Sequence, residues 1–231
     1  MVIVLGLLFS GCTKIISGSG KIVKEERPVQ IFSGIDLDAP FEIILERSPN
    51  YSVVLEGEDN ILPRIEIRVV NGILKIGYRQ SGKAPEHLLV RIKITMPALH
   101  QILIGRGGSA ISNSTWESPD LFFQVNGKSK LSVHIRSLNL RAIVAGSAEL
   151  NLSGTCSQAS YTISGSARLL AFPLASREVQ GTITGWGLCH LSVTDQLKAS
   201  IDGNGTIIYR GAPAALDVIV SGKGKISREI I

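Results

Sequence analysis

Apolar and polar residues alternate with a period of two along most of this chain, which is the pattern of half-buried β-strands. Short alternating runs occur within residues 31–78 and again at 90–96. Turn sequences such as Ser48-Pro49-Asn50 and Asn71-Gly72 separate these runs. No long window shows the spacing of three and four residues that an amphipathic helix requires. The sequence therefore predicts a chain that is nearly all β.

The second half of the chain contains a repeat. Its most regular member is a glycine that recurs at spacings of 19, 19, 20, 18 and 19 residues, namely Gly127, Gly146, Gly165, Gly185, Gly203 and Gly222. A β-branched residue stands two places before each glycine, and a small residue stands two places after it. The residue four places after each glycine is Leu, Ile or Cys.

Alternation in a fixed register is what a parallel β-solenoid requires, because like side chains then stack in columns on successive coils, roughly 4.8 Å apart. An antiparallel sandwich or barrel is the alternative, but nothing in that architecture enforces a constant repeat length. We therefore predict a β-solenoid with about 19 residues per coil. The first half of the chain does not contain this 19-residue repeat, and we expect less regular coils there.

The N-terminal residues carry the features of a lipoprotein signal. Residues 2–11 form an apolar stretch that is too short to span a membrane as a helix but typical of the core of a secretory signal. The run Leu8-Phe9-Ser10-Gly11-Cys12 resembles a bacterial lipobox, in which the cysteine is acylated and becomes the mature N-terminus. We expect a signal peptide at 1–11, a lipid on Cys12, a flexible tether at 12–20 and a single solenoid domain at 21–231. A free cysteine near a frayed terminus is the alternative, and it leaves the apolar run unexplained.

Several short motifs, spread over residues 18–231, resemble those of the head GIN domain family. They include Gly18-Ser19-Gly20-Lys21-Ile22-Val23, Phe32-Ser33-Gly34-Ile35, Glu58-Asp59-Asn60-Ile61-Leu62 and Ser164-Gly165-Ser166. Members of that family are described as putative autotransporter adhesins, and many are secreted or lipid-anchored proteins of the bacterial envelope. The resemblance implies a right-handed β-helix in the cell envelope, with no established catalytic activity and no family active site.

In a Gram-negative cell, Thr13 after the lipidated cysteine favours the outer membrane.

Composition narrows the classes of partner. The 231 residues are 44% hydrophobic, 19% charged and 5% aromatic, which is too apolar for a disordered chain. The Lys and Arg residues are scattered along the chain and few aromatic residues lie among them. Nucleic acid is therefore not an expected partner, despite a net charge of +5. The expected partners are the membrane through the lipid, an envelope glycan or protein, and other copies of the chain through the solenoid ends.

We expect no metal, no cofactor and no catalytic residue. Cys189 and His190 are neighbours on a strand and therefore point to opposite sides, which predicts a buried thiol and an exposed imidazole. Cys156 lies more than one coil from Cys189, so a disulfide between them is not expected.

An enzyme acting on carbohydrate remains an alternative. Such enzymes need carboxylates close together, but the acids of the registered coils fall by phase in different columns, namely Glu149, Glu178, Asp195, Asp202, Asp217 and Glu229. Acids in the less regular half, such as Glu42, Glu56 and Glu58, are not placed by the repeat.

One group of side chains forms a candidate binding surface. By alternation, Trp186, Leu188 and His190 point outward at the first, third and fifth places after their glycine. Their neighbours in the columns include Arg168, Leu170 and Ile208. An exposed indole among apolar residues suits docking of a partner or stacking on a sugar ring.

Two alternatives for this surface remain: the alternation resets after Gly187 and turns Leu188 inward, or another segment covers the group. The leading hypothesis is a lipid-anchored, adhesin-like module for a glycan or protein. A carbohydrate-active enzyme and a purely structural envelope protein are the competing hypotheses.

Overall fold

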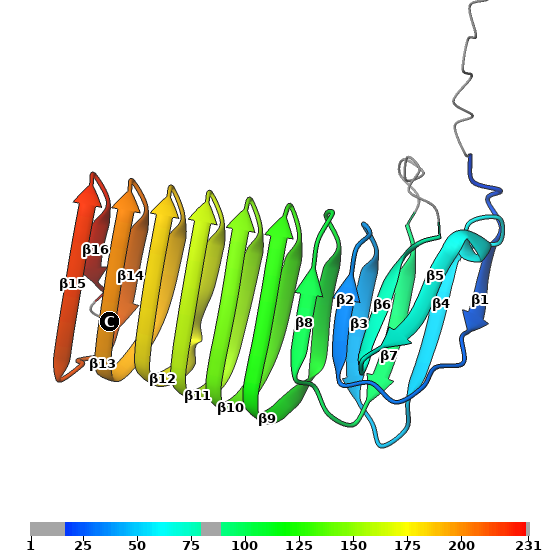
Figure 1. The fold of residues 1–231 in the computed structure, drawn as a ribbon, viewed down its shortest axis with the longest axis horizontal. Helices are drawn as coiled ribbons and strands as arrows, with labels where there is room; N and C mark the ends of the chain where they lie inside the picture. Colours follow the sequence, from blue (N-terminus) through cyan, green and yellow to red (C-terminus); the bar gives the residue numbers. More distant parts are fainter. Residues whose placement is uncertain (1–16, 80–88, 230–231) are drawn as a thin grey trace, which may run out of the picture.

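A computed structural model describes residues 17–79 and 89–229, and these residues form an elongated β-solenoid (Figure 1). The expected signal peptide and Cys12 lie outside the described residues. No helix within the described ranges is long and apolar enough to cross a membrane.

The regular coils are long strands that wrap around the solenoid. They are β9 (Ser109–Gly127), β10 (Lys130–Gly146), β11 (Glu149–Gly165), β12 (Arg168–Gly185) and β13 (Leu188–Gly203). Each runs down the back in Figure 1, rounds the lower edge and climbs the front to its glycine. The chain climbs the front and descends the back as it advances from β9 toward β15, so the solenoid is right-handed (Figure 1). We call the descending segments the back sheet and the climbing segments the front sheet.

Neighbouring coils pair in parallel and in nearly constant register. Lys130 pairs with Glu149, and the pairing continues to Gly146 and Gly165, 19 residues apart throughout. The predicted parallel solenoid with about 19 residues per coil is confirmed. Near the C-terminus each strand belongs to one sheet only. Strand β15 (Ala215–Gly222) lies in the front sheet, whereas β14 (Thr206–Arg210) and β16 (Lys225–Arg228) lie in the back sheet (Figure 1).

The N-terminal third is less regular, as expected, and its strands are not stacked in chain order. In the front sheet the order is β5-β6-β2-β8-β9, and in the back sheet it is β1-β4-β7-β3-β9. The bounds are β1 Ile22–Glu26, β2 Gly34–Leu37, β3 Glu42–Arg47, β4 Ser52–Glu58, η1 Leu62–Arg64, β5 Ile65–Val70, β6 Ile73–Tyr78, β7 Arg91–Met96 and β8 Gln101–Ile104. Strands β1, β4 and β5 pair antiparallel and close this end of the solenoid.

Apolar side chains stack in columns inside the solenoid. The column four places after the glycines is buried from β10 to β14 and consists of Leu131, Leu150, Leu169, Cys189 and Ile207. The glycines mark the upper turn, where the backbone is left-handed: φ is +73° at both Gly127 and Gly165. A Cβ on Gly165 would lie 3.0 Å from the carbonyl oxygen of Gly146, so successive turns also approach too closely for a side chain.

A column of small hydrogen-bonding residues shapes the lower edge. The Ser118 and Ser137 hydroxyls each donate to the carbonyl oxygen two residues later, at 2.8 Å. Cys156 occupies the same column, and its thiol contacts the Gln158 carbonyl oxygen at 3.1 Å. These bonds fix the turn by which each coil enters the front sheet.

The two ends of the solenoid differ. At the C-terminal end, all of β15 is exposed, including Leu216, Val218 and Val220, which continue buried columns of β13. No described segment covers this coil, so its apolar interior side chains face solvent.

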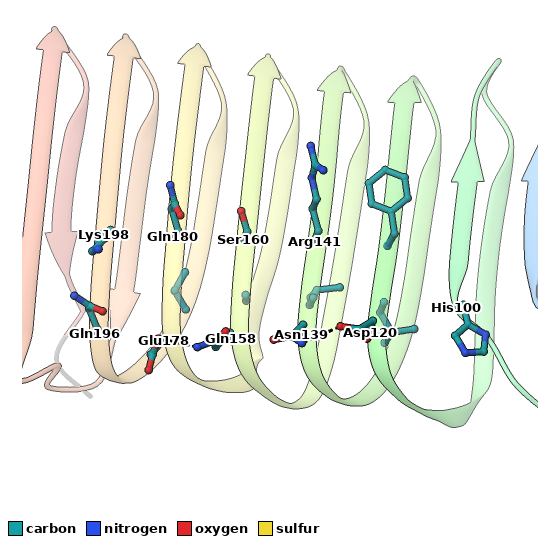
Figure 2. A pocket seen from close by; sticks show the side chains of 15 residues that line it. His100, Asp120, Asn139, Arg141, Gln158, Ser160, Glu178, Gln180, Gln196 and Lys198 are labelled. Atoms are coloured by element: carbon teal, nitrogen blue, oxygen red, sulfur yellow. Dashed lines mark hydrogen bonds between the residues drawn. The ribbon is translucent and has the colours of Figure 1, made fainter.

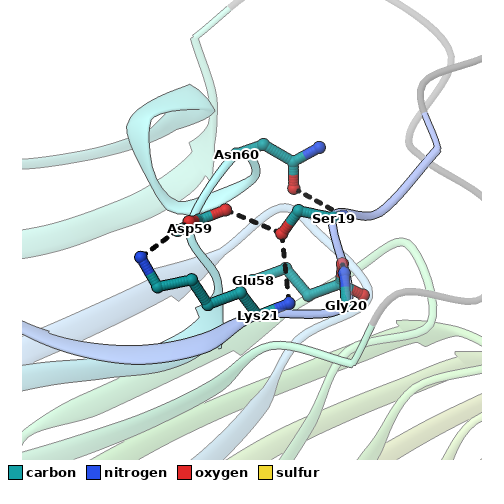
Figure 3. A network of polar contacts seen from close by, with 6 residues as sticks. All are labelled: Ser19, Gly20, Lys21, Glu58, Asp59 and Asn60. Atoms are coloured by element: carbon teal, nitrogen blue, oxygen red, sulfur yellow. Dashed lines mark hydrogen bonds and ion pairs between the residues drawn. The ribbon is translucent and has the colours of Figure 1, made fainter.

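Polar contacts bind the start of the described chain to the N-terminal end (Figure 3). The Ser19 hydroxyl donates to Asp59 Oδ1 at 2.7 Å, and Lys21 Nζ lies 3.4 Å from the other carboxylate oxygen. The Asn60 amide donates to the carbonyl of residue 17 at 2.8 Å. Residues 17–20, expected as the end of a flexible tether, are therefore bound to the loop after β4.

Candidate binding surface

The predicted surface lies on the back sheet, at the upper turn before β13. Trp186 is 70% exposed, and Leu188 and His190 are partly exposed, whereas Gly187 and Cys189 are buried. The alternation therefore continues through Gly187 without a reset. The described residues also leave the indole uncovered.

The residues that flank Leu188 and His190 on the neighbouring coils are the expected ones. Leu170, His190 and Ile208 pair in register across three coils, and Leu188 pairs with Arg168. Leu170, Leu188 and Ile208 are each partly exposed. This group is continuous in the sheet, because every member is adjacent to the next along a strand or across a pair.

Two further residues complete the surface. Both stand seven places after a glycine and continue the outward alternation, although they were not among the predicted residues. The Phe172 ring stacks on the His190 ring, with centroids 4.4 Å apart and planes 10° from parallel. The Arg210 guanidinium carbon lies 4.0 Å from the centroid of Phe172. Arg210 Nε donates to Glu229 at 2.7 Å, which holds the guanidinium in place. We call these eight residues the back patch: Trp186, Leu188, His190, Arg168, Leu170, Ile208, Phe172 and Arg210.

A local insertion places Phe172. The pairing of β12 with β13 shifts between Ala171 and Ala175, so residues 172–174 have no partners in that ladder. The Ser192 hydroxyl donates to the Phe172 carbonyl at 2.7 Å and closes the bulge. The signal in the sequence is the glycine spacing of 20 between Gly165 and Gly185, one residue longer than in the coils before it.

The imidazole of the back patch favours its neutral form. Burial lowers the pKa of His190; the Glu229 carboxylate opposes this shift, while Arg168 and Arg210 act in the same direction as burial. A neutral ring stacked on Phe172 extends an uncharged aromatic surface next to the exposed indole.

The described residues contain no group of three His, Cys, Asp or Glu side chains that could hold a metal ion. The three acids named as examples from the less regular half have separate partners. Glu42 pairs with Arg91 at 3.1 Å, Glu56 pairs with Lys24 at 3.2 Å, and Glu58 accepts a hydrogen bond from a backbone amide. Each therefore has its own structural contact on the surface.

The two described thiols are free. Burial raises the pKa of Cys156 to about 11 and holds the pKa of Cys189 far above its usual range. Neither is suited to nucleophilic chemistry at neutral pH, because the thiolate is the reactive form.

Several solved structures share the fold. A putative adhesin from Bacteroides fragilis superposes with a TM-score of 0.87 at 22% identity, over 93% of this chain and 100% of the other. A putative adhesin from Parabacteroides merdae gives 0.75 at 24% identity, over 93% and 99%. A putative lipid binding protein from Parabacteroides distasonis gives 0.75 at 21% identity, over 94% and 100%. At these identities the likeness establishes the fold.

No curated protein is similar to the chain at a significant level. The model of the family described as "Putative auto-transporter adhesin, head GIN domain" matches residues 31–213, which is most of the chain. The protein therefore belongs to the head GIN domain family of putative auto-transporter adhesins, and it is an adhesin-like β-solenoid of the cell surface or envelope.

Proposed function

We propose that this protein is a lipid-anchored module that holds a glycan or protein partner of the cell envelope against the back patch. The observation that carries the proposal is the 70% exposed Trp186 indole beside the stacked pair of Phe172 and His190. A large exposed aromatic side chain in a continuous apolar group is a common anchor for protein partners and a platform for sugar rings. Membership of an adhesin family supports the same function.

The position of the back patch fits display from a membrane. Residue 17 is bound at the N-terminal end of the solenoid, whereas the patch lies on β12, β13 and β14 near the opposite end (Figures 1 and 3). A lipid on Cys12 would hold the solenoid by its N-terminal end and leave the patch away from the membrane. Substituting Cys12→Ser should move the protein from the membrane fraction to a soluble or unprocessed form. Unchanged membrane association of that variant would contradict the anchor.

The test of the patch compares two substitutions of exposed apolar residues. Trp186→Ala removes the indole, and Leu138→Ala removes a side chain that is 59% exposed at the lower edge. Each should change the free energy of unfolding by no more than about 0.5 kcal/mol, since both side chains are exposed. Binding is measured on an array of glycans and on purified envelope proteins.

We expect only Trp186→Ala to reduce binding. A loss of stability without a loss of binding would mean that the indole is a packing residue, and the proposal would then be wrong. Equal binding by both variants and the unchanged protein would also contradict it.

The open C-terminal coil provides a second surface for association, and we propose that it pairs with the same coil of another copy. Strand β15 pairs only with β13, so its other edge is free among the described residues. Light scattering should give the mass of a dimer, and Val218→Lys should give a monomer. A monomeric mass for the unchanged protein would leave the charges of Lys223, Lys225 and Arg228 as the protection of this edge.

A further inference from the structure

A shallow groove of about 660 Å³ crosses the front sheet, on the opposite side of the solenoid from the back patch (Figure 2). Its lower rim is one column of polar side chains, a single residue from each of five coils, namely Asp120, Asn139, Gln158, Glu178 and Gln196. Figure 2 shows this column running along the solenoid axis just above the lower edge. The serine and cysteine contacts of that edge fix the turn directly before three of these residues, Asp120, Asn139 and Gln158.

The column is a ladder of hydrogen-bonding groups. The Asn139 amide donates to Asp120 Oδ1 at 2.8 Å, and the Gln158 amide donates to Glu178 Oε2 at 3.1 Å. A side-chain amide has two donor hydrogens and an accepting oxygen, so each retains capacity for a ligand. The ladder therefore offers donors and acceptors at Asn139, Gln158 and Gln196, and acceptors at Asp120 and Glu178, with successive coils roughly 4.8 Å apart.

The hollow follows from side-chain size. In the column above the ladder, Ser160 stands between Arg141 and Gln180, with which it is in register. A serine between two long side chains leaves a depression over β11. Figure 2 shows the short Ser160 side chain at the middle of the groove.

The charges of the groove nearly balance. Asp120 and Glu178 each accept a hydrogen bond from a neighbouring amide, and Arg141 and Lys198 supply two positive charges. At one end the Phe122 ring lies 5.8 Å from the Arg141 guanidinium and offers an aromatic face. With two acids on the lower rim and two bases in the column above it, neither an anion nor a cation is favoured.

We infer that this groove binds a linear, uncharged oligosaccharide that lies along the solenoid axis. The length of one sugar unit in an extended chain is close to the spacing of one coil, so hydroxyl groups of successive units meet successive amide or carboxylate side chains of the ladder. A peptide fits less well. Peptide recognition by a sheet requires unpaired backbone at an edge or pockets for apolar side chains, whereas these front strands are paired on both sides and the groove is rich in amides.

The groove is a place for binding and not for cleavage. Asp120 and Glu178 are three coils apart in the ladder, about 14 Å at the coil spacing. The paired carboxylates of glycoside hydrolases are at most about 9.5 Å apart. Bound oligosaccharide should therefore be recovered intact.

The test uses two substitutions on the same strand. Ser160→Trp fills the hollow, whereas Thr162→Trp places the same indole two residues further along the front sheet, where Thr162 is exposed and outside the groove. The probes are β-1,4-linked gluco- and xylo-oligosaccharides of increasing length, with oligogalacturonate as the charged probe. Binding is measured by calorimetry.

Affinity for a neutral probe should increase with chain length up to about five units, one per coil of the ladder. Ser160→Trp should weaken that binding by about tenfold or more, and Thr162→Trp should leave it unchanged. Should Ser160→Trp also lower the melting temperature, Gln158→Ala provides a second variant, because Gln158 is exposed and truncation there removes one ladder amide.

Three results would overturn the inference: no binding of any neutral probe at millimolar concentration, equal effects of the two Trp substitutions, or preference for oligogalacturonate. The inference is independent of the back patch. If Trp186→Ala, rather than Ser160→Trp, abolishes binding of the neutral probes, the groove is excluded and the back patch is supported.

Discussion

The glycine column of the upper turns allows a quantitative test of the solenoid, using Gly127→Ala and Gly165→Ala. Both glycines have φ of +73°, so both substitutions place an alanine in the same left-handed conformation. They differ in what the new Cβ meets. At Gly127 nothing lies within 4 Å, whereas at Gly165 the carbonyl oxygen of Gly146 would lie 3.0 Å away and its Cα 3.4 Å away.

The left-handed conformation costs an alanine about 1–2 kcal/mol, and the reduced freedom of the unfolded chain returns about 0.4–1 kcal/mol. Gly127→Ala should therefore cost about 1 kcal/mol, which lowers the melting temperature of a chain this long by about 2–4 °C. At Gly165 the backbone of the neighbouring coil must also move, which adds about 1–3 kcal/mol. We therefore expect Gly165→Ala to lower the melting temperature by at least twice as much as Gly127→Ala does.

Thermal unfolding followed by circular dichroism measures both shifts, and the unchanged far-ultraviolet spectrum of each folded variant is the control. Equal shifts for the two variants would refute the reasoning, because they would show that the close approach of successive coils contributes nothing beyond the backbone conformation. A larger shift for Gly127→Ala would refute it too.

Two further predictions concern ionisable groups. With its pKa raised to about 11, Cys156 should react with iodoacetamide at pH 8 about two orders of magnitude more slowly than an ordinary thiol, and Cys189, whose pKa is raised further, should react more slowly still. Both should react at the ordinary rate after denaturation, and fast labelling of the native protein would contradict their burial. The hydrogen bond from Ser19, aided by Lys21, lowers the pKa of Asp59 below its ordinary value of 3.8. Because the folded pKa is the lower one, this contact stabilises the N-terminal segment above pH 3.8 and is lost as the pH falls through the folded pKa. The protection of the Lys21 amide, meaning its exchange rate relative to the intrinsic rate at the same pH, should therefore fall in acid, and an identical acid response in Asp59→Asn would count against the contact.

The inward columns could be predicted from the sequence because each coil repeats them. Leu131, Leu150 and Leu169 are the same residue in the same register, and Cys189 is recognisable as a member of their column from its place after a glycine. The outward direction of Trp186 follows from the same alternation, and the structure places it outside.

Features that depend on contacts between unlike residues could not be predicted in this way. Phe172 stacks on His190 beside a bulge at residues 172–174, and the spacing of the glycines signals this bulge but not the contact between the two rings. The groove exists because Ser160 is shorter than its neighbours in two adjacent coils, and no motif marks such a difference in size. The strand order of the N-terminal third depends on pairing of distant segments, such as β2 with β6 and β8, for which no repeat provides a register.

The solenoid separates the residues that determine stability from those available for binding. Inward columns and glycine turns must be nearly constant, because a coil that departs from them creates a cavity or a clash with its neighbours. Outward residues contribute little to stability, typically within about 0.5 kcal/mol each, so their identity can follow the ligand. A ligand that lies along an outward column makes one weak contact per coil, and its affinity then depends on how many coils it crosses. For that reason the ladder from Asp120 to Gln196, which crosses five coils, can select a polymer by its length as well as by its chemistry.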